Sequence, residues 1–248
     1  MIPMTAPLDP NSMCLWWPKI KRLQIPQPRT IILPEPEPGA LDQYLFAVAD
    51  DEPDNIPDCW ADYEGRVAAA AESLGYPCFL RTDLASGKHG WERCCFVSNA
   101  QALGDHIFAV IENGHLVDML GLNHHALVVR EFLDLWSTFR APRFGNMPVA
   151  RERRYFVRDA EVICHHPYWP EDAVADGQPD DPEWRRMLRE LNFEWPGEVE
   201  RLMDYADMVA KAMGDGYWSV DFACGSGGDW YLIDMALGDA SWHPDHDV

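Results

Sequence analysis

The sequence predicts an α+β protein built from two lobes, and three observations lead to this prediction. Apolar runs of strand length and amphipathic runs of helix length follow in the order strand, helix, strand, loop, helix and strand, then hairpin, helices and hairpin. The chain has 248 residues, 47% of them hydrophobic, so it can bury a sizeable core. The element pattern changes near residue 126. We therefore expect a flexible leader at 1–15, an N-terminal lobe at 16–125 and a C-terminal lobe at 126–248.

The elements of the first lobe are marked by their ends. A strand is expected at Thr30–Leu33, and a helix from Asp58 to Leu74 that Gly75 terminates. A further strand, Cys78–Arg81, leads into the loop Asp83–Gly90. This loop holds small residues and Lys88, a composition that lets backbone N–H groups close around phosphate, although it is not a Walker loop. The alternative is an exposed turn with a solvated lysine.

The remaining elements follow from capping signals and apolar periodicity. Ser98–Gln101 matches a capping box and opens a helix, which a second helical stretch from His115 to Leu120 follows. After it we expect a buried strand at 127–133, a loop through Gly145 and Pro148, strands at 151–157 and 161–167 joined by a tight turn at 159–160, and helices at 181–190 and 198–213.

The total charge excludes several classes of function. Twenty basic residues against 41 acidic ones give a net charge of −21, which argues against a nucleic-acid backbone or an anionic membrane surface as the main partner. No apolar run approaches the roughly 20 residues of a membrane span, and the start has no signal-peptide pattern. Seven cysteines without a CxxC spacing suit reduced thiols. We expect a cytoplasmic protein.

Residues 217–237 predict a β-hairpin that carries one acid in each strand. Two apolar and aromatic runs flank a glycine-rich break, and Asp221 and Asp234 lie within them. Two carboxylates facing one another repel by roughly 4 kcal/mol at 4 Å and an effective dielectric near 20. A cation between them would remove this repulsion, and Mg²⁺ takes oxygen ligands of this kind beside substrate phosphates. The alternative is a pair of strand-end acids that meet water.

Arginines concentrate in one stretch of this acidic chain. Between 140 and 158 there are six arginines against one acid, which indicates a concave, positive surface for an anionic ligand (Arg140, Arg143, Arg151, Arg153, Arg154 and Arg158). Arg153 and Arg154 are adjacent on a strand, so one of them should point into the structure and need an acid or a phosphate as partner. The alternative is a surface strand whose solvated arginines balance acidic helices.

The histidines give weaker signals. His165 and His166 point to opposite faces of a strand, so we do not expect them to share a metal ion. One of them could face a substrate near Arg154, and the sequence leaves open which. The tail residues His243, Asp245 and His246 are expected to be a polar tail.

Taken together, these parts resemble the ATP-grasp superfamily. The resemblance covers about Trp16 to His243, and its motifs are specific in combination: FLRTDLASGKH at 79–89, VVRE at 128–131, RYFVRD at 154–159, HPYWP at 166–170 and WSVDF at 218–222. The sequence is most similar to short ATP-grasp proteins of bacteriophages and actinobacteria. A more distant likeness is to the eukaryotic cell-division-cycle ATP-grasp protein that helps assemble a translation initiation factor. The resemblance implies two α+β lobes with a nucleotide site between them.

The resemblance also assigns roles to residues. It implies that Arg81 contacts the α- and β-phosphates of ATP, that Lys88 lies in a flexible loop over them, and that the backbone of Glu131, Phe132 and Leu133 holds the adenine edge. It implies that Arg154 holds the γ-phosphate and stabilises the transferred charge, which makes Arg154 and Lys88 the candidate catalytic residues. Asp221 and Asp234 would be the Mg²⁺ ligands.

Two departures separate this chain from the usual pattern. Ala236 stands where the family places an asparagine ligand, so Asp239 or water would have to replace it. Arg81 replaces the usual lysine, and it can still bind phosphate with two hydrogen bonds.

The resemblance implies an ATP- and Mg²⁺-dependent ligase that joins a carboxylate to an amine or another nucleophile through an acyl phosphate. The main alternative is an ATP-binding module that chaperones a protein partner with little turnover. A phosphotransferase or nucleic-acid-modifying ligase fits the acidic charge less well.

Overall fold

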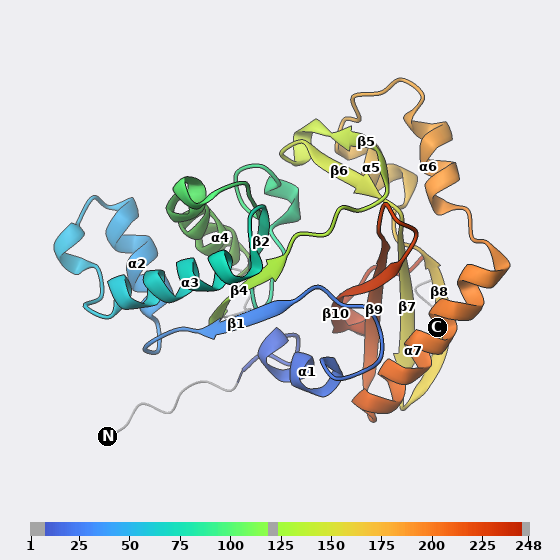
Figure 1. Cartoon of the computed structure of the whole chain (residues 1–248), viewed down its shortest axis with the longest axis horizontal. Helices are drawn as coiled ribbons and strands as arrows, with labels where there is room; N and C mark the ends of the chain where they lie inside the picture. The colour runs from blue at the N-terminus through green and yellow to red at the C-terminus, as the bar shows by residue number, and fades with distance from the viewer. Residues whose placement is uncertain (1–7, 119–123, 245–248) are drawn as a thin grey trace. The chain divides into compact units, whose positions relative to one another are not determined.

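The computed structural model describes residues 8–118 and 124–244, which form two compact units. Unit 1 contains Arg29–Phe132, Phe144–Met147 and the N-terminal segment through Cys14; unit 2 contains Leu15–Pro28, Leu133–Arg143 and the chain from Pro148 onward. Each unit combines helices with an antiparallel sheet, which confirms the α+β prediction (Figure 1). Each unit is described below by itself.

Unit 1 has a four-stranded sheet in the order β1-β4-β2-β3. All its neighbours are antiparallel. The strands are β1 (Thr30–Pro34), β2 (Cys78–Thr82), β3 (Phe96–Val97) and β4 (Ala126–Glu131). The helices α2 (Ala40–Ala49), α3 (Trp60–Leu74) and α4 (Leu103–Asp118) cover one face, and the core contains buried side chains from all three helices and from all four strands. The period of two in the strands therefore sends alternate side chains of β2 and β4 to the opposite face.

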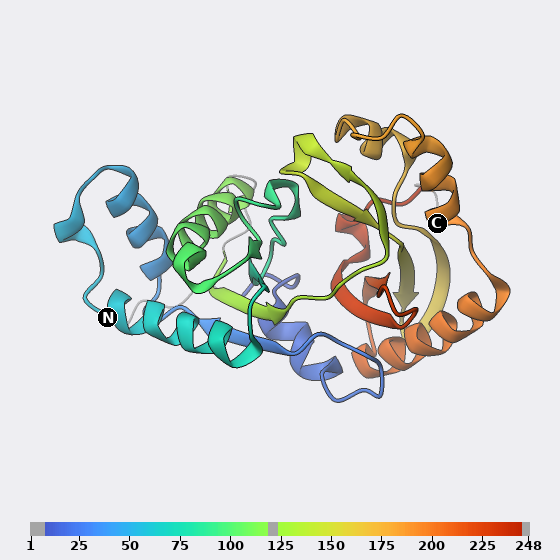
Figure 2. The same ribbon diagram turned by 45° about the horizontal axis from the view of Figure 1, so that its top comes forward.

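Unit 2 has a four-stranded antiparallel sheet in the order β10-β9-β7-β8 and contains most of the two-stranded sheet β5-β6. The strands are β5 (Ser137–Ala141), β6 (Met147–Ala150), β7 (Glu152–Arg158), β8 (Glu161–Pro167), β9 (Tyr217–Cys224) and β10 (Trp230–Leu237). The helices are α5 (Glu171–Asp176), α6 (Trp184–Asn192) and α7 (Pro196–Met213), and α7 runs along one face of the large sheet (Figure 2).

Most predicted elements are confirmed, and the closing hairpin has its predicted strands. The tight turn also forms, with positive φ at Asp159 and Ala160, the conformation that a two-residue hairpin turn requires. Gly75 and Gly214 end α3 and α7 as expected. The predicted stretch from His115 continues α4, and its last two residues, 119 and 120, lie outside the described residues.

Some predictions were wrong. The loop predicted from Asp134 to Pro148 contains β5 and β6, whose short polar sequences lack strand periodicity. Ser98 is not the cap of the predicted capping box: the side chain of Asn99 accepts from the N–H of Ala102 instead.

The chain also divides differently from the predicted ranges. β4 pairs with β1 and β2, so it belongs to unit 1 although it lies in the predicted range 126–248. Of the predicted leader, residues 1–7 lie outside the described residues, while Ser12 is fully buried and Met13 begins α1 (Met13–Ile20).

Candidate functional site

One row of polar side chains crosses the large sheet of unit 2. In the strand register, Asp234 lies opposite Asp221, Asp221 opposite Arg154, and Arg154 opposite His166. Directly opposed residues of neighbouring strands point to the same face. All four strands therefore contribute one side chain each to a row of two acids, an arginine and a histidine.

A β-bulge puts Asp234 into this row. Trp230, Tyr231 and Leu232 pair in step with β9, and the register then shifts between Leu232 and Asp234. Without the extra residue, Ile233 would lie opposite Asp221, and Asp234 would point to the other face of the sheet. The bulge thus produces the opposed acids that the sequence predicted.

Arg154 and Asp221 form a bidentate ion pair at the centre of the row. Nε of Arg154 donates to Oδ1 of Asp221 and Nη2 donates to Oδ2, both at 2.8 Å. The side chains are 11% and 8% exposed. Burial disfavours the charged guanidinium, but the carboxylate of Asp221 outweighs this, and the pKa of Arg154 is raised. Arg154 is therefore a fixed cation, and its Cζ lies 4.6 Å from the centroid of the Tyr168 ring.

The two acids have the chemistry of a magnesium site. Carboxylate oxygens are the ligands that Mg²⁺ prefers, and one or two protein carboxylates plus substrate phosphates are its usual set. Each oxygen of Asp221 that accepts from Arg154 keeps a further lone pair for a metal. Within residues 8–118 and 124–244, no three His, Cys, Asp or Glu side chains gather closely enough to hold an ion by themselves. The donor set therefore fits an ion that also binds a ligand.

The C-terminal segment lies on the same face of the sheet. Nη1 of Arg154 donates to the carbonyl of Trp242 at 3.4 Å, and the hydroxyls of Ser219 and Ser241 lie 2.7 Å apart. Nε2 of His243 lies 3.1 Å from Sγ of Cys164. The predicted polar tail is thus packed on the row through His243, while Asp245 and His246 lie outside the described residues.

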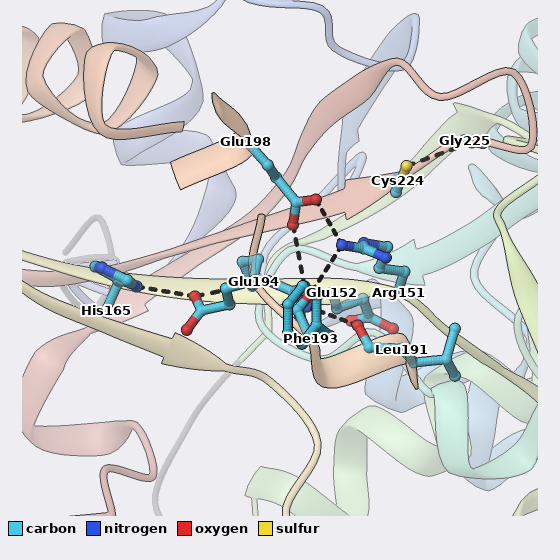
Figure 3. Close-up of polar contacts among 10 residues, drawn as sticks. Arg151, Glu152, His165, Leu191, Phe193, Glu194, Glu198, Cys224 and Gly225 are labelled. Atoms are coloured by element: carbon cyan, nitrogen blue, oxygen red, sulfur yellow. Dashed lines mark hydrogen bonds and ion pairs between the residues drawn. The ribbon is translucent and has the colours of Figure 1, made fainter. Parts of the chain in front are cut away.

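The opposite face of β7 buries two other arginines. Arg151 and Arg153 are 4% and 1% exposed, and both bind Glu198 of α7, at 2.6 Å and 3.0 Å. Figure 3 shows Glu198 directed at Arg151, and Glu194 directed at His165, whose Nδ1 lies 3.0 Å from its carboxylate. The prediction that one of Arg153 and Arg154 points into the structure is confirmed for Arg153.

The predicted positive surface is corrected by these pairs. Three of its six arginines are neutralised by acids from β9 and α7: Arg151, Arg153 and Arg154. The sequence did not reveal this because those acids lie 47 and 67 residues further along the chain.

In unit 1, Arg81 lies on the sheet face opposite the helices. Its neighbours Leu80 and Cys78 belong to the core under the helices, so Arg81 points the other way, and it is 3% exposed. Arg130 of β4 lies opposite Phe79 and points to this same face, and it is also buried. Sequence reasoning missed Arg130, although it stands inside the quoted motif at 128–131, because neither its spacing nor its neighbours mark it.

The Lys88 loop is held at its end by residues 144–147. Lys88 begins a short 3₁₀ helix, Lys88–Gly90, after Gly87 with a φ of 64°. The N–H groups of Trp91 and Glu92 donate to the carbonyls of Phe144 and Gly145. A Cβ on Gly145 would lie 2.6 Å from the nitrogen of Trp91, and the φ of Gly145 is 63°.

We therefore expect Gly145→Ala to displace the segment that follows Lys88. The positive φ and the backbone contact both oppose a side chain at this position. If Lys88 binds phosphate, ATP affinity measured by calorimetry should fall several-fold. Gly65→Ala in α3 is the matched control, because its added Cβ meets nothing within 4 Å. Equal affinities in the two variants would contradict a phosphate-binding role for the loop.

Glu131, Phe132 and Leu133 span the end of β4 and the border between the units in the chain. Oε2 of Glu131 accepts from the N–H of Arg29, and its own N–H donates to the carbonyl of Arg29. The ring of Phe132 packs edge-on against Phe96, with centroids 5.2 Å apart. These contacts fix the backbone of this segment within unit 1.

A hollow of about 390 Å³ in unit 2 contains none of the predicted site residues. Its lining comes from β5 and the segment before α6: Ser137, Thr138, Phe139, Arg140, Asp180, Asp181 and Pro182. Among the described residues, no helix is both long and apolar enough to span a membrane.

Comparisons with solved structures show the fold. Cdc123 from Schizosaccharomyces pombe superposes with a TM-score of 0.54 at 14% identity, covering 91% of this chain and 82% of that one. D-alanine–D-alanine ligase from Bacillus anthracis, complexed with ATP, gives 0.49 at 13% identity, covering 94% and 58%. N5-carboxyaminoimidazole synthase from Aspergillus clavatus gives 0.48 at 12%, covering 91% of this chain and 44% of that one. This chain thus spans about half the length of these two enzymes.

Sequence comparison identifies the family. No curated protein matches the chain. Residues 70–248, which include the whole row in unit 2 as well as Arg81, Lys88 and Glu131, match the model of an ATP-grasp domain family, described as family 3 of its clade. The fold is that of ATP-grasp proteins. The chain belongs to this family of ATP-grasp domains.

Proposed function

We propose that this protein is an ATP- and Mg²⁺-dependent ligase that joins a carboxylate to an amine or another nucleophile through an acyl phosphate. The observation that carries the proposal is the row of Asp234, Asp221 and Arg154 in a chain of the ATP-grasp family. Two hard oxygen ligands beside a fixed cation suit a metal-bound phosphate. The acceptor and donor substrates are a small-molecule pair or a protein, and the chain is cytoplasmic, since all seven of its cysteines are free thiols.

The residues would divide the work between binding and transfer. Arg81 and Lys88 of unit 1 would bind the phosphates, and the backbone of Glu131 to Leu133 would bind the adenine edge. Asp221 and Asp234 would hold Mg²⁺, which supplies charge neutralisation when bound. Arg154 would bind the γ-phosphate. As the carboxylate oxygen attacks phosphorus, negative charge grows on the transferred group, and a fixed guanidinium stabilises it.

The proposal is tested with hydroxylamine as a general acceptor. Hydroxylamine converts an acyl phosphate into a hydroxamate, so a panel of carboxylates can be screened without knowledge of the natural amine. The panel holds the twenty amino acids and common dicarboxylic acids, with MgATP. We expect ADP and hydroxamate to form together with at least one carboxylate. ATP binding without hydroxamate from any member would instead favour the binding module.

One feature favours the binding module as the second candidate. Ala236 stands where the resemblance expects an asparagine ligand; it pairs with Ser219, whose hydroxyl donates to the Ala236 carbonyl. An alanine side chain cannot bind a metal. A module that binds ATP with two carboxylates and chaperones a protein partner would show one stoichiometric protein on purification and no carboxylate-dependent ADP formation.

The metal assignment predicts that Asp234→Asn lowers Mg²⁺-dependent ATP affinity by about 100-fold or more, since outer-shell changes alone cost 10–100-fold in metal affinity. The substitution leaves the Arg154–Asp221 pair in place, so the thermal midpoint should change little. Calorimetry with ATP, with and without Mg²⁺, measures the effect, and Asp229→Asn in the exposed turn is the control.

Asp221→Asn should lower ATP affinity and also stability. It weakens the bidentate pair and leaves a guanidinium that is 11% exposed without its charged partner. If both asparagine variants bind ATP with unchanged affinity in Mg²⁺, the two acids are not the metal ligands.

A further inference from the structure

The row contains a histidine nitrogen with an unusual environment. His166 is 8% exposed, and its Nε2 is buried and has no hydrogen-bond partner among the described residues. A buried polar atom without a partner costs about 1–3 kcal/mol. A protein keeps such an atom where a ligand supplies the missing partner.

The other ring nitrogen fixes the tautomer. Nδ1 of His166 lies 2.7 Å from the carbonyl oxygen of Pro167. A carbonyl oxygen only accepts, so Nδ1 carries the hydrogen, and in the neutral ring Nε2 carries the lone pair. The buried nitrogen is therefore a hydrogen-bond acceptor that needs a donor.

The charges around the ring keep it neutral. Burial lowers the pKa of His166, and the hydrogen bond to Pro167 opposes this. Arg154 of β7 and His243 of the C-terminal segment lower the pKa further, while Asp221 of β9 raises it. The net direction is downward, so the imidazole is a neutral base at physiological pH.

We propose that His166 binds the attacking amine of the acceptor substrate through Nε2 and takes its proton during transfer. This inference rests on the ligase function proposed above, and it answers which histidine of the pair faces the substrate. His166 lies opposite Arg154, the proposed ligand of the γ-phosphate, whereas His165 points to the other face and pairs with Glu194.

The step balances without a further reactant. The amine nitrogen attacks the acyl carbon with its lone pair, and the bond from that carbon to the phosphate oxygen breaks. Inorganic phosphate leaves with the electron pair, and the proton that the nitrogen must lose moves to Nε2 of His166. The indole of Trp242, which is 43% exposed, lies edge-on against the imidazole at 5.1 Å between centroids and is the side chain that the amine displaces.

Two substitutions separate binding from proton transfer. His166→Asn keeps a donor for the Pro167 carbonyl and removes Nε2, so kcat/KM for hydroxylamine should fall by about 100-fold or more. His166→Gln keeps an acceptor oxygen near the position of Nε2 but no base, so KM for hydroxylamine should stay near the wild-type value while kcat falls. The KM for the carboxylate should not change in either variant. His165→Asn, on the same strand and the other face, is the matched control.

Ring nitrogen resonances give a readout that needs no carboxylate. In the full chain with Mg²⁺ and a non-hydrolysable ATP analogue, ¹⁵N-histidine spectra should show His166, assigned by its loss in His166→Asn, with an unprotonated Nε2. Added hydroxylamine should shift this Nε2 resonance and leave His165 unchanged. A hydrogen on Nε2 of the neutral ring, or no shift at saturating hydroxylamine, overturns the inference.

The outcomes distinguish this inference from the function on which it rests. Hydroxamate formed by the wild type and equally well by His166→Asn would leave the ligase function standing and overturn the role of His166. A shifted Nε2 resonance without hydroxamate from any carboxylate would support the amine site and contradict the ligase.

Discussion

Arg154→Ala should reduce the rate of carboxylate-dependent ADP formation by about 1,000-fold while ATP affinity falls by less than about tenfold. Loss of a single donor to developing charge typically costs 10²–10³ in kcat, and loss of an arginine that stabilises a transferred phosphoryl group costs 10³–10⁵. The charge on the transferred group is larger in the transition state than in bound ATP, so the effect should appear in kcat more than in KM.

The structure adds a second variant to this test. Arg154→Ala leaves Asp221, 8% exposed, without its ion-pair partner, so part of any loss could come from unfolding. Arg154→Lys keeps the charge and loses the two parallel hydrogen bonds, and it should lose turnover with a smaller change in the thermal midpoint. Arg158→Ala, at the end of the same strand where Cζ stacks 4.2 Å from the Tyr217 ring centroid, is the control. Equal losses of kcat and ATP affinity in Arg154→Lys would make Arg154 a binding residue only.

The row in unit 2 could be predicted from the sequence only in part. The hairpin strands, the strand that carries Arg154 and the strand that carries His166 all follow from apolar runs and turn residues. The facing of Asp221 and Asp234 depends on one bulged residue, Ile233, and the residues of this run do not mark a bulge. Register across strands far apart in the chain, such as β7 with β9, is set by packing of the whole sheet, which no local pattern records.

The two neighbouring arginines show the same limit. Alternation along β7 predicts that Arg153 and Arg154 point to opposite faces, and the structure confirms this. Which face is covered by α7 depends on where that helix packs, so the partner of each arginine could not be named. The candidate tail illustrates the opposite error: Ser241, Trp242 and His243 have the composition of a solvated tail, but aromatic and hydroxyl contacts hold them against the sheet.

Glu198→Ala should lower the free energy of unfolding by about 3–5 kcal/mol, the usual cost of removing one partner from a buried ion pair. Glu198, with its side chain 11% exposed, binds Arg151 and Arg153, whose side chains are 5% and 1% exposed. Burial lowers the pKa of Arg153 against the raising effect of Glu198, so loss of this carboxylate leaves two costly cations beside each other. Urea denaturation measures the change.

The control is an ion pair on an exposed helix surface. Glu190→Ala removes the partner of Arg186 at 2.5 Å in α6, where the side chains are 61% and 51% exposed, and should change the midpoint little because water solvates both groups. A midpoint for Glu198→Ala as close to wild type as that of Glu190→Ala would show that water reaches Arg151 and Arg153. The two arginines would then be available to an anionic ligand, and the positive surface inferred from the sequence would extend to this face of the sheet. A large loss would instead confine the anion-binding cations of unit 2 to the face that carries Arg154.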